Sequence, residues 1–126
     1  MSAVSLQAVD VLVIEDDYYL ADDMRQMLED AGAHVLGPCR DAIAAFQELE
    51  QHHADCAVVD VNLGRGPSFD PARELLARGI SVVLVTGYDA KVIPAELSHL
   101  PCLQKPTEPQ KVVKAVHDIC SAAARP

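Results

Sequence analysis

The chain has 126 residues, 50% of them hydrophobic and 23% charged, which is typical of one packed globular domain and excludes disordered and collagen-like classes. Nineteen acidic residues against ten basic ones leave a net charge of -9, so we expect no direct binding to nucleic acid or to an anionic membrane. No apolar stretch approaches the roughly 18 residues that a membrane span needs, and the N-terminus lacks a basic flank and a signal-like apolar core. We therefore expect a cytoplasmic protein without membrane insertion.

Short apolar runs alternate with helical patterns along the first half of the chain. After a short tail over residues 1–8, an apolar run over 9–14 predicts a buried strand that ends at three consecutive acids. Apolar positions with helical spacing follow from residue 18, and Gly32 supplies a helix stop. A short strand over 34–36 and a helix up to residue 49, which Asp41 can cap, continue the alternation.

The second half repeats this order. Residues 56–61 form an apolar run, and Asp70-Pro71 offers a cap and a first-turn proline for the next helix. A strand over 80–85 follows, and Pro94 limits residues 89–99 to a short or broken helix because proline lacks a backbone donor. A weak fifth strand over 100–103 and a final helix over 108–123 complete a domain over residues 9–124, after which we expect no output domain.

Five strands that alternate with helices predict an α/β fold with a doubly wound, five-stranded parallel sheet and helices on both faces. In the flavodoxin-like strand order 2-1-3-4-5, the winding direction reverses between the first and third strands, and a site forms beyond their carboxyl ends. These two strands end at Glu15-Asp16 and at Asp60.

Glu15, Asp16 and Asp60 are thus expected to meet at one sheet edge, joined there by Thr86 and Lys105 from the ends of the last two strands. Three converging carboxylates repel one another unless a cation is present, and hard oxygen ligands suit Mg²⁺. A carboxylate beside Mg²⁺ can attack phosphorus and form an acyl phosphate, which makes Asp60 the candidate acceptor. The Thr86 hydroxyl and the Lys105 ammonium can then hold the phosphoryl oxygens.

Four short motifs stand at the ends of the predicted strands, in the order Glu15-Asp16-Asp17, Val58-Val59-Asp60-Val61-Asn62-Leu63, Val85-Thr86-Gly87 and Gln104-Lys105-Pro106. Together they resemble the acid-pair, phosphoacceptor, hydroxyl and lysine–proline motifs of receiver domains in two-component response regulators. The resemblance covers nearly the whole chain, from about Val9 to Ala123.

The resemblance implies a phosphoacceptor rather than an enzyme, with Asp60 taking a phosphoryl group from a histidine kinase or a phosphotransfer protein. It implies Mg²⁺ on Asp16, Asp60 and the backbone carbonyl of Asn62, with Glu15 acting through a coordinated water. It also implies a cis peptide bond before Pro106. We expect a single-domain regulator that signals by phosphorylation-dependent binding to an unknown downstream protein, or that acts as a phosphorelay or phosphate sink.

One departure concerns the position three residues before the lysine, where most receivers carry an aromatic residue and this chain has Cys102. Thr86-Gly87-Tyr88, Pro94 and residues 101–106 resemble an atypical subgroup called FATGUY. In most receivers the aromatic ring at the position of Cys102 reorients together with the hydroxyl residue. Because Cys102 has no ring, we expect ordering of the loop over residues 86–99 to be the two-state element instead.

Two other classes of function stay open. A haloacid-dehalogenase-like phosphatase also uses an aspartate nucleophile, a lysine and Mg²⁺. Such a phosphatase has a second carboxylate two residues after the nucleophile, but this chain has Asn62 at that position. A flavodoxin-like cofactor carrier has a glycine-rich or hydroxyl-rich phosphate-binding loop after the first strand, but this chain has three acidic residues there.

Overall fold

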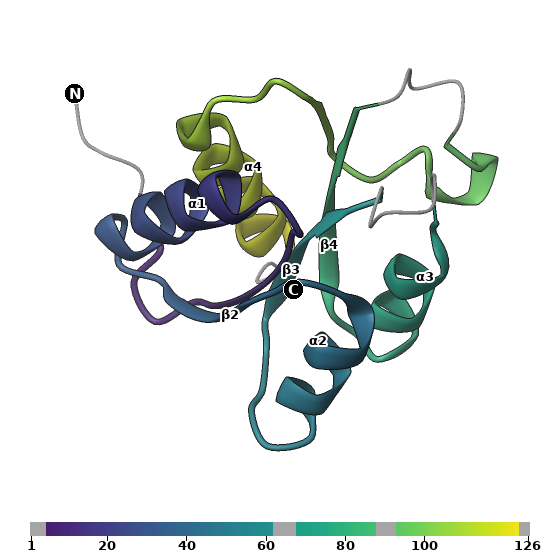
Figure 1. Cartoon of the computed structure of the whole chain (residues 1–126), viewed down its shortest axis with the longest axis horizontal. Coiled ribbons are helices and arrows are strands. Elements are labelled where there is room, and N and C mark those ends of the chain that lie inside the picture. The colour runs from purple at the N-terminus through teal and green to yellow at the C-terminus, as the bar shows by residue number, and fades with distance from the viewer. Residues whose placement is uncertain (1–4, 62–67, 88–92, 124–126) are drawn as a thin grey trace.

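The computed structural model describes residues 5–61, 68–87 and 93–123, which form a parallel sheet between two layers of helices (Figure 1). The sheet has the order β2-β1-β3-β4-β5, and every neighbouring pair is parallel, as the sequence predicts. The strands are β1 (Asp10–Ile14), β2 (His34–Cys39), β3 (Cys56–Asp60), β4 (Ser81–Thr86) and β5 (Cys102–Gln104). The helical elements are α1 (Tyr18–Asp30), α2 (Ala42–Leu49), α3 (Asp70–Ala77), the 3₁₀ turn η2 (Ala95–Leu97) and α4 (Pro109–Ala123).

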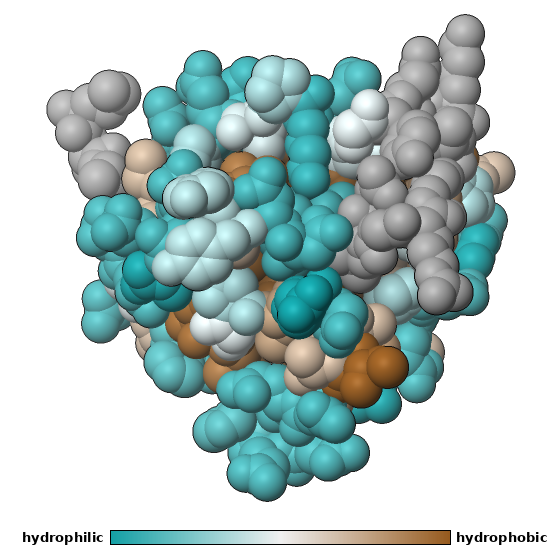
Figure 2. Space-filling model, in the orientation of Figure 1, coloured by the Kyte–Doolittle hydropathy of each residue, from teal (hydrophilic) through white to brown (hydrophobic). Residues whose placement is uncertain are grey.

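Two apolar cores lie on the two faces of the sheet, because successive side chains of a strand point to opposite faces. Val11 and Val13 of β1 pack in the core that α1 and α4 cover. Leu12 and Ile14 pack in the other core, under α2 and α3. Burial on both faces explains why the strands are continuous apolar runs. The face of the molecule that Figure 2 shows is mainly hydrophilic.

Local sequence signals set the ends of the first two helices. Asp17 caps α1, since its Oδ1 accepts a hydrogen bond from the Leu20 N–H at 3.1 Å. Asp41 caps α2 in the same way, with the Ala44 N–H as donor at 2.9 Å. Gly32 ends α1 with a φ of +106°, a backbone conformation that glycine adopts without steric cost.

The predicted cap of α3 is wrong in one detail. Asp70 is the first residue of the helix instead of its cap, and Phe69 holds the cap position without a side-chain hydrogen bond. The Asp70 carboxylate accepts a hydrogen bond from Arg73 Nη1 at 3.0 Å, so Asp70 forms an ion pair with Arg73 on the helix surface. Pro71 lies in the first turn, as expected.

Strand β2 is longer than predicted, because it continues through Gly37 and Pro38 to Cys39. The register between β1 and β2 shifts between Leu12 and Ile14, which accommodates the extra residue. Gly37 has a φ of +95°, and a Cβ there would lie 2.5 Å from the backbone nitrogen of Cys39. Only glycine fits this bulge, so Gly37 interrupts the apolar pattern without ending the strand.

The segment before β1, expected to be a tail, contributes to the core. Leu6 is 1% exposed and packs among the side chains under α1 and α4. Its N–H donates to the carbonyl of Ala31 at 2.7 Å, and its carbonyl accepts from the Val9 N–H at 3.0 Å. These contacts join the start of the domain to the end of α1.

The connection from β4 to β5 contains one 3₁₀ turn, η2, within its described residues. This agrees with the short or broken helix expected over 89–99, of which residues 89–92 lie outside the described ranges. Strand β4 runs one residue further than predicted and includes Thr86, while β5 begins at Cys102. None of the helices in the described ranges is long and apolar enough to cross a membrane.

Candidate functional site

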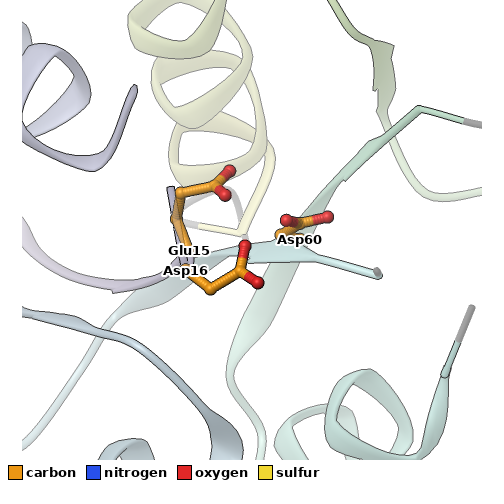
Figure 3. Close-up of side chains that lie close together, drawn as sticks. All are labelled: Glu15, Asp16 and Asp60. Atoms are coloured by element: carbon orange, nitrogen blue, oxygen red, sulfur yellow. The ribbon is translucent and has the colours of Figure 1, made fainter. Parts of the chain in front are cut away.

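Three carboxylates meet at the carboxyl end of the sheet, between β1 and β3. Glu15 and Asp16 follow β1 directly, and Asp60 is the last residue of β3. One carboxylate oxygen from each of the three lies within 4.8 Å of the others, and Figure 3 shows them around one small space. The convergence predicted from the strand order is therefore present, at the point where β2 and β3 lie on opposite sides of β1.

Lys105 places a positive charge between two of these carboxylates. Its Nζ lies 3.0 Å from Asp60 Oδ2 and 3.2 Å from Glu15 Oε1. The backbone positions this side chain, since the Lys105 N–H donates to the carbonyl of Thr86 at 2.7 Å as the chain leaves β5. The peptide bond between Lys105 and Pro106 is cis, as the resemblance implies.

Burial controls the electrostatics of this site. The side chains of Glu15 and Asp60 are fully buried, whereas that of Lys105 is 27% exposed. Burial raises the pKa of Glu15 to about 7, against the lowering effect of a hydrogen bond from the Asp17 N–H. Burial lowers the pKa of Lys105, but its hydrogen bond to Asp60 and its two anionic neighbours outweigh this effect and raise it. Lys105 is thus a permanent cation that neutralises only part of the negative charge.

The residues present fit a divalent cation. Glu15 Oε1 is buried and accepts no hydrogen bond, with the Lys105 ammonium at 3.2 Å as an ion-pair partner only. When all three carboxylates are ionised, the Lys105 ammonium balances one of their three negative charges. Carboxylate oxygens are the hard ligands that Mg²⁺ prefers. Asn62, whose carbonyl was predicted to be a further ligand, lies outside the described residues.

Thr86 belongs to the same sheet edge. It is the last residue of β4, is 1% exposed, and follows Val85, which pairs with Asp60 across the two strands. The Val61 N–H donates to the Val85 carbonyl at 3.0 Å, which continues the pairing past the end of β3. The fold therefore brings the predicted hydroxyl group to the strand end next to the predicted acceptor.

A groove of about 410 Å³ opens beside the acid pair, and two of the residues that line it, Pro38 and Arg40, were not predicted from the sequence. Pro38 and Arg40 line it from the end of β2, and Tyr18 lines it from the start of α1. The available signal was the predicted strand order, because it places the end of β2 beside the end of β1. The groove is lined by Glu15, Asp16, Tyr18, Ala21, Asp22, Pro38 and Arg40.

This sheet order and its acidic edge define a class of signalling domains. A family model described as the response regulator receiver domain matches residues 11–117, and the chain belongs to that family. The family predicted from the four motifs is therefore confirmed, while the FATGUY subgroup stays a prediction.

Similar proteins agree with this assignment. Transcriptional regulatory protein PdtaR of Mycobacterium tuberculosis is 29% identical over 75 residues, which cover 60% of this chain and 37% of that protein. An uncharacterized response regulatory protein of Yersinia pestis is 26% identical over 109 residues, which cover 84% of this chain and 46% of that protein. The chain thus matches less than half the length of these curated relatives.

The solved structures show the same fold. The receiver domain of the response regulator PhyR from Erythrobacter litoralis superimposes with a TM-score of 0.82, at 17% identity and 96% coverage of both chains. This likeness supports the predicted α/β fold.

Proposed function

We propose that this protein accepts a phosphoryl group on Asp60 from the phosphohistidine of a kinase or a phosphotransfer protein. The observation that carries the proposal is the position of the Asp60 carboxylate, buried at a strand end, 3.0 Å from the Lys105 ammonium and beside an acid pair. An Asp60 oxygen forms a bond to phosphorus while the P–N bond of the phosphohistidine breaks. The electron pair of that bond stays on the imidazole nitrogen.

The other residues of the site have separate tasks in this proposal. Lys105 balances negative charge on the phosphoryl oxygens, and the Thr86 hydroxyl donates a hydrogen bond to one of them. Glu15, Asp16 and Asp60, with the backbone carbonyl of Asn62, would hold Mg²⁺ directly or through water. When bound, the metal supplies positive charge that offsets repulsion between the carboxylates and the incoming phosphoryl group.

The protein is in this view a phosphoacceptor that assists its own phosphorylation and its slow dephosphorylation, and not an enzyme for a separate substrate. Its output is phosphorylation-dependent binding to another protein, or transfer of the phosphoryl group along a relay or into a sink. Phosphotransfer profiling against histidine kinases identifies the phosphoryl donor, and following the phosphoryl group afterwards separates a relay from a sink. A relay protein passes the group on to a second histidine protein, whereas a sink loses it to water.

Asp60→Asn tests the acceptor, because an amide is not a competent nucleophile toward phosphorus. Intact-mass spectrometry after treatment with phosphoramidate and Mg²⁺ should show one added phosphoryl group in the wild-type protein and none in the variant. Asp23→Asn, at an exposed position of α1, is the matched control and should be labelled like the wild type. Undiminished labelling of the Asp60 variant would place the acceptor elsewhere.

A further inference from the structure

Within its described residues, 87 and 93–101, the connection that follows Thr86 is joined to the sheet at its end, where the Leu84 N–H donates to the Pro101 carbonyl at 2.8 Å. The backbone hydrogen bonds around η2 are local, from Leu97 N–H to Pro94 at 2.9 Å, from Ser98 N–H to Ala95 at 3.2 Å and from Leu100 N–H to Leu97 at 3.1 Å. They hold the turn together and do not attach it to the sheet. Within the described residues, the position of η2 therefore depends on its side chains.

Two kinds of side-chain contact hold this connection. Leu97 is 2% exposed, and Ile93 and Leu100 pack against the core under α2 and α3. Apolar packing of this kind is not directional. Directional contacts come from Arg73 of α3, whose Nε and Nη2 donate to Glu96 Oε1 at 3.0 and 2.8 Å.

Arg73 is itself held in place on α3. Its Nη1 donates to Asp70 Oδ1 at 3.0 Å, so one guanidinium joins a residue of its own helix to a residue of η2. Hydrogen bonding to Arg73 holds the pKa of Glu96 below its usual range, so Glu96 is anionic at neutral pH. The planar guanidinium donates two hydrogen bonds to one carboxylate and a third to another, so the geometry of this contact is well defined.

The ion pair joins the two chain segments that leave the phosphorylation site. Helix α3 follows the loop after Asp60, and η2 lies in the connection after Thr86 (Figure 1). Arg73 and Glu96 are 23 residues apart in the sequence, so the contact exists only in the folded domain. A displacement of η2 away from α3 lengthens or breaks this contact.

We propose that the Arg73–Glu96 ion pair is a brake on phosphorylation, because it holds the β4–β5 connection against α3 in the arrangement described here. The inference rests on the proposed function, in which the Thr86 hydroxyl donates a hydrogen bond to the phosphoryl group on Asp60. The connection begins at the next residue, and in this proposal the new hydrogen bond of Thr86 shifts η2 away from α3. A contact that favours the unphosphorylated arrangement lowers the affinity for a phosphoryl group, and its removal raises that affinity by the same factor.

The test measures the dissociation constant of beryllofluoride, a mimic of the acyl phosphate, in the presence of Mg²⁺. Glu96→Gln and Arg73→Gln should each bind beryllofluoride roughly two- to fivefold more tightly than the wild type, the range that exposed ion pairs provide. The double variant should gain no more than either single variant, because both remove the same contact. The charge exchange of Arg73→Glu with Glu96→Arg should return the affinity to the wild-type value.

A matched control comes from α1. Glu29→Gln breaks an exposed ion pair with Arg25 at 2.7 Å that lies within one helix, and it should leave beryllofluoride affinity unchanged. Amide exchange of residues 93–100 should become faster in Glu96→Gln and stay unchanged in Glu29→Gln. These two measurements separate a brake from a general loss of stability.

The outcomes distinguish the brake from the function on which it rests. If the wild type binds beryllofluoride and the Glu96 and Arg73 variants bind it equally or more weakly, the brake is overturned and the acceptor function stands. If the wild type neither binds beryllofluoride nor takes up a phosphoryl group, the proposed function fails first.

Discussion

Replacing Glu15 by Gln in Mg²⁺-free protein should remove a pH dependence of stability that the wild-type protein carries. Burial raises the pKa of Glu15 from 4.5 to about 7 in the folded protein. Between these two values the folded state binds more protons than the unfolded state, so the free energy of unfolding falls as the pH rises. The stabilising contribution of a protonated Glu15 is fully present below pH 4.5 and is lost as the pH passes 7.

The size of this effect follows from the same two pKa values. At about 1.4 kcal/mol for each pH unit, the difference corresponds to roughly 3 kcal/mol in total, most of which falls between pH 5 and pH 8. This is a large part of the stability of a small domain. The physical cause is that a fully buried carboxylate stands beside another one, with a single ammonium shared between them.

Urea unfolding in EDTA at pH 5 and pH 8 measures the effect. The free energy of unfolding of the wild type should fall by roughly 2 to 3 kcal/mol more than that of Glu15→Gln over this range, because groups common to both proteins cancel in the comparison. Glu50→Gln, at an exposed position just after α2, is the control and should follow the wild type. Mg²⁺ should restore stability to the wild type at pH 8. Parallel pH profiles for the wild type and Glu15→Gln would refute the reasoning.

Three further predictions concern single positions. Asp16→Asn should leave Mg²⁺-free stability equal or higher, since it relieves carboxylate repulsion, and should weaken Mg²⁺ binding; a lower melting temperature in EDTA would contradict this. Gly37→Ala should lower the free energy of unfolding by on the order of 2 kcal/mol more than Gly79→Ala, because both glycines have positive φ but a Cβ contacts other atoms only at Gly37. Leu6→Ala should lower it by about 2 to 5 kcal/mol in urea unfolding, whereas no change would mean that this segment is a tail after all.

The sequence by itself determined the layered α/β fold and the edge at which the site lies. Strands buried on both faces are apolar, so β1, β3 and β4 end visibly where a carboxylate or a hydroxyl stands. Parallel strands place those ends at a single edge, which is why Glu15, Asp60 and Lys105 could be assigned to one site without coordinates.

Other features depended on neighbours that are distant in the sequence, and only the tertiary structure decided them. Leu6 lies in a short segment that gives no periodic signal, and its burial follows from contact with the end of α1. The course of β2 through Gly37 depends on the register with β1. The raised pKa of Glu15 and the contact between Arg73 and Glu96 exist because separate elements pack together. Periodicity reports which face of an element is buried, but the distance between two side chains and their removal from water are set only when the elements are packed.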